Sequence, residues 1–135
     1  MSNRDLFQRV KELKLPEGKY ALFGSAPMGI RGIKDCHDID IIIAEDLWNT
    51  YRLNPDWKFG MTENGSEYLS CGDIKLWYTW TPWYSDIENL IAEAEIIDGL
   101  PFVRLERVLE WKKKYSREKD LKDIEIIEKF LRMQK

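Results

Sequence analysis

The hydrophobic pattern of the first half of the chain predicts a helix, two strands and a second helix. The opening segment has apolar residues on one helical face and charged residues around it. Ser2 or Asn3 can cap the N-terminus of this helix, and Asp5 is favourable in its first turn. The next apolar runs, "KYALFGS" and "DIDIIIA", have the length and β-branched content of short strands. Helical spacing returns at residues 45–53, and Pro55 closes that segment.

The second half predicts a strand meander followed by helices. The runs "WKFGM", "SEYLS" and "IKLWYTW" are separated by the turn signals "ENGS" and "CGD". A helix is expected over residues 86–97, with Gly99 as its stop, and then a short strand in "LPFVRL". Two more helices should follow, and the apolar side of the last one carries Leu121, Ile124, Ile127 and Leu131.

This order of elements predicts a mixed α/β (α+β) domain whose sheet is covered by helices on at least one face. A length of 135 residues fits one domain over residues 1–135, with a helical tail at about 103–135. Hydrophobic residues make up 44% of the chain, which is enough for a core.

Charge and cysteine content narrow the class of protein. A net charge of -3 argues against an extended nucleic-acid surface, which needs a dominant basic face. The two cysteines, Cys36 and Cys71, lie in no disulfide or metal motif, so a reduced, cytoplasmic setting is expected. The N-terminus lacks the apolar core of a signal peptide, and no apolar run approaches the ~20 residues that cross a bilayer.

The first candidate for chemistry is the pair Asp38 and Asp40. Residues two apart in a strand face the same side, so these carboxylates lie side by side while Ile39, Ile41 and Ile43 face the core. Two close carboxylates repel each other, and a divalent cation removes the conflict. Mg²⁺ prefers such oxygens and commonly retains substrate phosphates as further ligands. The pair therefore suggests a metal site.

The second candidate is the pair Gly24 and Ser25 at the end of the preceding strand. Glycine permits close backbone approach there, Ser25 is a good helix N-cap, and Pro27 suits a first helical turn. A helix that starts here would direct its backbone N–H groups at an anion. Phosphate beside metal carboxylates makes a nucleoside triphosphate the natural ligand.

These residues carry a family resemblance. The series "FGS", "GIR" and "DIDI" resembles the signature of the nucleotidyltransferase superfamily related to DNA polymerase β, and the chain is closest in size to its minimal nucleotidyltransferases. The ending "LERVLEWKKKYSREKDLKDIEII" is similar to the helical tails of small members. The likeness extends over most of the chain, but only residues 23–43 carry specific motifs.

The resemblance implies a nucleotidyltransferase fold, a small mixed sheet flanked by helices with further helices at the C-terminus. It implies that Gly24 and Ser25 contact triphosphate and that Asp38 and Asp40 hold Mg²⁺ or Mn²⁺. The reaction would transfer a nucleotidyl group to a hydroxyl of an acceptor, and the sequence leaves open whether that acceptor is a small molecule, a protein or an RNA. By position, Arg31 and Lys119 are further candidates for nucleotide contacts.

One feature departs from the family pattern, which includes a third carboxylate on a neighbouring strand. In "GDIKLWYTW" the positions where the acid is expected hold Lys75 or Trp77, and Asp73 is displaced toward the turn. Either Asp73 acts from this earlier position as a third catalytic carboxylate beside Asp38 and Asp40, or the third carboxylate is missing. In the second case metal binding can survive while catalysis is weak or absent.

Several alternatives stay open. A fold of this kind without turnover would make the chain a binding or regulatory protein, for example an antitoxin-like partner. The aromatic residues Trp77, Trp80, Trp83 and Tyr84 suit base stacking, but they equally suit a strand and turn. Asp120 and Asp123 can pair with nearby basic residues on the surface at little energetic consequence.

Overall fold

A computed structural model of the chain describes residues 2–63, 65–79, 87–115 and 117–134, without the side chains of Tyr115 and Lys119. The first half contains α1 (Asn3–Glu12), β1 (Tyr20–Phe23), α2 (Ala26–Gly29), β2 (Ile39–Ile43), α3 (Glu45–Tyr51) and β3 (Lys58–Met61). The second half contains β4 (Glu67–Cys71), β5 (Ile74–Trp77), α4 (Ile87–Ala92), β6 (Glu95–Ile97), β7 (Leu100–Phe102), α5 (Leu105–Tyr115) and α6 (Glu118–Met133).

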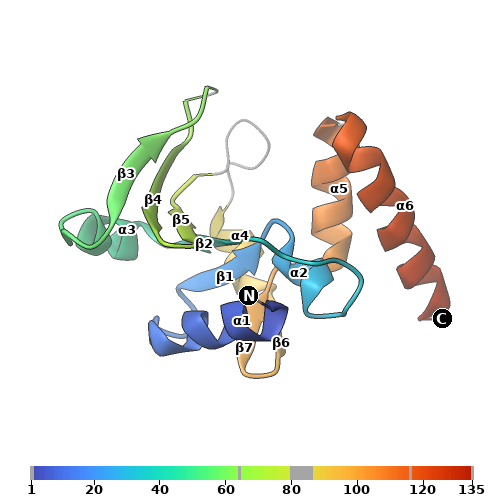
Figure 1. Cartoon of the computed structure of the whole chain (residues 1–135), viewed down its shortest axis with the longest axis horizontal. Helices are drawn as coiled ribbons and strands as arrows, with labels where there is room; N and C mark the ends of the chain where they lie inside the picture. The colour runs from blue at the N-terminus through green and yellow to red at the C-terminus, as the bar shows by residue number, and fades with distance from the viewer. Residues whose placement is uncertain (1, 64, 80–86, 116, 135) are drawn as a thin grey trace.

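The described strands form one mixed sheet in the order β3-β4-β5-β2-β1-β7-β6. β2 lies at its centre, antiparallel to β1 and parallel to β5. The β3–β4 hairpin rises on one side of the molecule and the α5–α6 pair on the other (Figure 1). The mixed α/β class expected from the sequence is confirmed.

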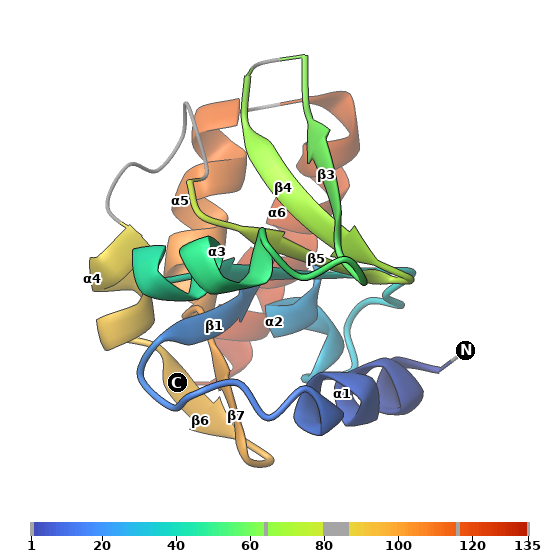
Figure 2. The same cartoon turned by 90° about the vertical axis from the view of Figure 1, so that its left-hand side faces the viewer.

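Helices cover both faces of the sheet, because the strands place apolar residues alternately on each side. One core cluster joins Leu22, Ile39, Ile41 and Ile43 to α1 and α3. The other joins Phe23, Ile42 and Trp77 to residues of α4, α5 and α6. Figure 2 shows α3 in front of the sheet and α5 and α6 behind it. Asp40 alternates with the three isoleucines, so it lies on the α4–α6 face.

The start of α1 and the strand predictions agree closely with the structure. The Ser2 hydroxyl accepts from Asp5 N at 3.1 Å, and the Asp5 carboxylate accepts from Ser2 N at 3.2 Å, which is the expected capping box. The two cysteines are both free, with Cys36 buried. Within the described residues no helix is both long and apolar enough to cross a membrane.

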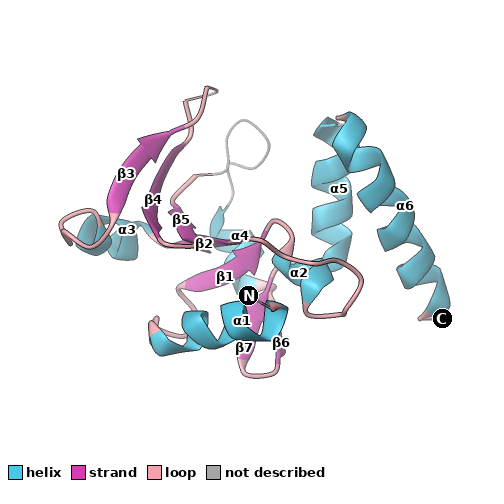
Figure 3. Ribbon diagram, viewed as in Figure 1, coloured by secondary structure: helices cyan, strands magenta, loops and turns pink. Residues whose placement is uncertain are grey.

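The predicted helix over residues 86–97 is wrong in its second half. α4 ends at Ala92, and Glu95–Ile97 instead form β6, antiparallel to β7 (Figure 3). The turn between them uses Asp98 at φ 52° and Gly99 at φ 81°. An Asp-Gly pair is a strong signal for a β-hairpin, because both turn positions need positive φ. Here it favours a hairpin over the helix that the apolar spacing suggested.

The predicted apolar side of the last helix is also partly wrong. Leu121 is 57% exposed, whereas Asp120 and Asp123 are only 1% and 6% exposed. Residues 120, 123 and 127 share one face of a helix, since three and seven residues bring the chain back to the same side. The buried face of α6 therefore includes two aspartates that form ion pairs. A prediction that counts only apolar residues assigns the wrong face.

Candidate functional site

The central strands bring the two sequence motifs together. β1 and β2 are antiparallel, and Phe23 pairs with Asp40, so the end of one strand meets the beginning of the other. Gly24 and Ser25 follow Phe23 directly, while Asp38 stands just before β2. The structure therefore places the Gly-Ser pair next to the aspartate pair, at one end of two paired strands.

Gly24 is in closest contact with Asp40. Its φ is +61°, in the left-handed region that side chains disfavour, and an ideal Cβ there would lie 2.6 Å from Asp40 Oδ2. Real Cβ atoms essentially never approach another atom that closely, so a side chain at this position would meet a disfavoured backbone angle and would have to displace the Asp40 carboxylate. The carboxylate of Asp40 thus lies directly against the backbone of the turn.

Ser25 does not cap a helix with its side chain, contrary to expectation. It has helical φ and ψ of -81° and -15°, and its hydroxyl makes no capping bond. Its carbonyl oxygen instead accepts from Gly29 N at 2.9 Å and starts the four-residue helix α2. Pro27 does stand in the first turn as predicted. Any anion would therefore meet the turn at Gly24 and Ser25 rather than a long helix dipole.

The segment between the two motifs is fastened to α1 and α2. Asn3 donates from Nδ2 to Lys34 O at 2.8 Å and accepts from Cys36 N at 2.7 Å. The Cys36 thiol donates to Ser25 O at 3.5 Å, and its sulfur fills the space beside Gly29. Burial raises the pKa of this thiol, so Cys36 acts as a packed residue rather than a nucleophile.

Asp40 is half-buried and unusually costly to ionise. Removal from water raises its pKa to about 6, a shift that the negative charge of Asp38 increases. Two groups oppose the shift: Trp77 donates from Nε1 to Asp40 Oδ1 at 2.9 Å, and Lys75 contributes a positive charge. The indole bond fixes Oδ1, so Oδ2 is the oxygen beside Gly24.

The position on β5 where a third carboxylate was expected holds a lysine. In the parallel pairing of β2 and β5, Lys75 is the partner of Asp40. Asp73 lies at the turn before β5 and forms an ion pair with Arg9 of α1, at 3.0 Å between Asp73 Oδ2 and Arg9 Nη1. Among the described residues, which include Asp38, Asp40 and Asp73, no three His, Cys, Asp or Glu side chains are grouped so as to hold a metal ion.

Arg31 and Lys119 are the two further candidates for nucleotide contacts. Arg31 donates to Pro27 O at 2.7 Å and forms an ion pair with Glu95 of β6, so its guanidinium is engaged within the protein. Lys119 belongs to α6, but its side chain lies outside the described part. Of the aromatic run, Trp77 is described and contacts Asp40, while Trp80, Trp83 and Tyr84 lie outside the described residues.

A second cluster of charges joins the helical tail to the segment before β2. Lys112 of α5 pairs with Asp120 at 3.4 Å and with Asp123 at 3.1 Å. Arg117 approaches Asp120 at 2.8 Å, and Lys34 approaches Asp123 at 2.6 Å. We call these five residues the tail ion cluster. The pairing of these acids with nearby basic residues, one of the alternatives from the sequence, is confirmed, but both acids are buried and do not lie on the surface.

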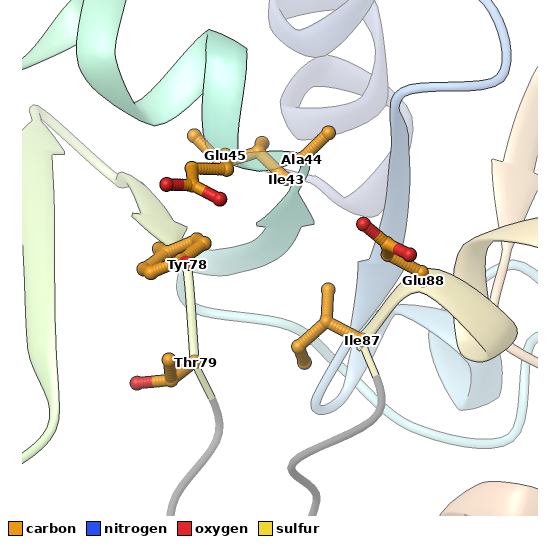
Figure 4. Close-up of a pocket in the computed structure, with 7 residues that line it drawn as sticks. All are labelled: Ile43, Ala44, Glu45, Tyr78, Thr79, Ile87 and Glu88. Atoms are coloured by element: carbon orange, nitrogen blue, oxygen red, sulfur yellow. The ribbon is translucent and has the colours of Figure 1, made fainter.

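A small cavity lies at the opposite end of β2 from Asp40. Its volume is about 190 Å³, and its lining includes Ile43, Glu45, Tyr78, Thr79 and Glu88. Figure 4 shows the Glu45 carboxylate above the Tyr78 ring and Glu88 on the side of α4. The charge of Glu45 raises the pKa of Tyr78 above its ordinary value, so this phenol stays protonated. The sequence predicted Ile43 as a core residue and assigned no chemistry to the residues of this cavity.

A larger groove of about 640 Å³ lies along α1, between Asn3, Phe7 and the segment around Ile30. It contains neither aspartate of the pair and neither Gly24 nor Ser25, so it is separate from the predicted chemistry.

Comparison with known proteins identifies no relative: no family model, no curated protein and no solved structure matches the chain. The functional interpretation therefore rests on the residues and their geometry.

Proposed function

We propose that the chain is a nucleotidyltransferase-like protein with a nucleotidyltransferase fold, which binds a nucleoside triphosphate together with Mg²⁺ or Mn²⁺. The single observation that carries this proposal is the contact of Asp40 Oδ2 with the turn at Gly24. A backbone turn that receives phosphate and a carboxylate that receives a cation are here in direct contact. A metal–triphosphate complex presents a cation beside phosphate oxygens, and a neighbouring carboxylate and backbone turn suit such a ligand.

The residues divide the work as follows. Asp38 is exposed, and Asp40 presents one oxygen beyond its indole bond, so the pair suits one divalent cation. When bound, the cation would neutralise charge on the phosphates and stabilise a leaving pyrophosphate. Gly24 allows the phosphates close to the backbone. The cation would also remove the repulsion that contributes to the high pKa of Asp40.

A second candidate function is nucleotide-dependent binding or regulation without turnover. Two observations favour it: Lys75 stands beside Asp40, and Asp73 is paired with Arg9. Transfer of a nucleotidyl group to an acceptor hydroxyl remains the first candidate, with Asp73 as the carboxylate that would have to leave Arg9 to take part.

The decisive experiment measures triphosphate binding and pyrophosphate release. Each of the four ribonucleoside triphosphates is titrated with Mg²⁺ or Mn²⁺ into the full chain, with thermal stability and calorimetry as readouts. Asp38→Asn and Asp40→Asn should each weaken metal-dependent binding by about tenfold or more, the effect of losing one charged ligand. Asp56→Asn, which changes an exposed carboxylate on a loop, is the matched control.

The outcomes separate the two candidates. Pyrophosphate release that Asp73→Asn abolishes would establish transfer with Asp73 as the third carboxylate. Binding without release, in the presence of varied hydroxyl acceptors, would establish the regulatory function. If no triphosphate changes the stability of the wild-type protein with either cation, the nucleotide proposal is wrong.

A further inference from the structure

Lys75 is the residue next to Asp40 across the central strands. Asp40 and Lys75 are register partners, and in a parallel pair such partners present their side chains on the same face of the sheet. Trp77 is on this face too, two residues further along β5, and its indole donates to Asp40. The sheet face that carries Asp40 therefore also carries two groups from β5, the ammonium of Lys75 and the indole N–H of Trp77.

The ammonium of Lys75 is held in place by an aromatic ring. Its Nζ lies 5.0 Å from the centroid of the Tyr68 ring, within the range of a cation–π contact. Tyr68 is itself fixed against Trp77, with ring centroids 4.9 Å apart. Tyr68, Lys75 and Trp77 thus form one packed unit on β4 and β5. A lysine held in this way is a fixed positive charge rather than a freely moving one.

A fixed ammonium changes what the neighbouring carboxylates can bind. A site for two divalent cations needs additional anionic ligands, and the position that would supply one carries a positive charge. A second divalent cation there would be repelled by Lys75, whereas an anionic phosphate would be attracted. Lysine also donates up to three hydrogen bonds to phosphate oxygens without any metal.

We propose that Lys75 takes the place of a second cation, so that the site accepts one divalent cation and Lys75 contacts the phosphates directly. This inference rests on the proposed triphosphate site. It has a consequence that the general proposal lacks, because part of the triphosphate affinity should persist when all divalent cations are removed.

Two substitutions at Lys75 test the inference. Lys75→Met keeps the apolar stem on Tyr68 and removes the charge, and Lys75→Glu supplies the carboxylate that the position lacks. Lys58→Met is the matched control, since Lys58 is an exposed lysine on β3. The measurements are ATP, GTP, CTP and UTP affinity in EDTA, and the number of Mn²⁺ ions bound per chain with triphosphate, counted by electron paramagnetic resonance.

The expected result has three parts. The wild-type protein binds triphosphate in EDTA and binds one Mn²⁺ when that ion is supplied. Lys75→Met weakens binding in EDTA by about tenfold or more, the effect of losing a charge-assisted hydrogen bond, and still binds one Mn²⁺. Lys75→Glu binds a second Mn²⁺. The control matches the wild type in both measurements.

Other results overturn the inference. Two Mn²⁺ ions on the wild-type protein, or equal affinity of wild type and Lys75→Met in EDTA, would make Lys75 a packing residue on Tyr68 only. Those outcomes leave the triphosphate site intact. Failure of the wild-type protein to bind any triphosphate, with or without cation, would instead disprove the proposed function itself. Denaturant unfolding of each variant confirms that it is folded before binding is scored.

Discussion

The chain holds two pairs of aspartates whose surroundings have opposite effects. Asp120 and Asp123 face Lys112, Arg117 and Lys34 in the tail ion cluster. The charge of Asp38 acts against ionised Asp40, and the nearby groups that favour ionised Asp40 are one indole N–H and one lysine charge. Both pairs are separated by only two or three residues in sequence, so the partners rather than the spacing distinguish them.

The pKa values express the difference. Burial alone would raise the pKa of Asp120, but the Arg117 hydrogen bond and the Lys112 charge outweigh it and lower the pKa. For Asp40 burial dominates and raises the pKa to about 6. Ionised Asp120 therefore stabilises the fold, and ionised Asp40 destabilises it. A carboxylate kept at such a cost beside a backbone turn is typical of a binding site rather than a structural ion pair.

The largest effect should come from breaking the tail ion cluster. Asp120→Asn removes the carboxylate that faces both Arg117 and Lys112, so Asp123 becomes the one acid of the cluster beside its three cations. We expect a loss of about 3–5 kcal/mol in the free energy of unfolding, measured with urea. Glu125→Gln, at an exposed position of α6, should cost less than about 0.5 kcal/mol. Equal small losses for both variants would show that the cluster is not a structural pair.

The next effect tests the contact between Gly24 and Asp40. Gly24→Ala puts a Cβ into both a positive φ and the space of Asp40 Oδ2, and we expect a cost of about 2–4 kcal/mol in unfolding free energy. Gly32→Ala is the control, because Gly32 has φ +74° with open space around it, and it should cost about 1 kcal/mol. Adding Asp40→Ala to Gly24→Ala should recover part of the difference. Identical costs for the two glycines would disprove the close contact.

A smaller effect of opposite sign should follow from neutralising Asp40. Its pKa is higher in the folded state, at about 6, than the ordinary value of 3.8, so the folded protein binds more protons between these pH values. Ionised Asp40 therefore does not destabilise the fold below about pH 4, and its full destabilising effect is present above about pH 6. We expect Asp40→Asn to stabilise the ligand-free protein by about 2–3 kcal/mol at pH 7 and to match the wild type closely at pH 4. Unfolding at both pH values, with the exposed-loop variant Asp56→Asn as the matched control, checks the sign.

The smallest effect concerns the indole bond. Trp77→Phe removes the donor to Asp40 Oδ1, and we expect a cost of about 1 kcal/mol at pH 7. The pKa of Asp40 should rise further, which carboxyl-carbon NMR titration can follow. Trp48→Phe makes the same change in a buried tryptophan on the opposite face and should leave that titration unchanged. A titration that moves equally in both variants would contradict a direct bond.

Local patterns predict most of the fold, because alternation and capping depend on neighbours in sequence. The period of two in "DIDIIIA" places Asp40 opposite the three isoleucines, and the Ser2 cap follows from three adjacent residues. The helix expected over 95–97 failed because the Asp98-Gly99 turn overrides helical spacing. That signal was present in the sequence and can be read from it.

The candidate site is less predictable, because it depends on the register between strands far apart in sequence. Neither the indole bond from Trp77 nor the pairing of Lys75 with Asp40 follows from spacing, since β2 and β5 are joined only by the fold. One of the partners of buried Asp123 is Lys34, which is 89 residues away in sequence. The sequence shows only that these acids share a helix face with Ile127.

The ion pair between Lys34 and Asp123 also makes the tail and the predicted ligand site thermodynamically linked. Lys34 lies four residues before Asp38, so docking of α6 restrains the backbone that carries the first aspartate. Linkage is reciprocal: a ligand that orders this segment must strengthen the docking of α6 by the same free energy that the docked helix adds to ligand affinity. Hydrogen exchange of the α6 amides, with and without triphosphate, would measure that shared free energy from the helical tail.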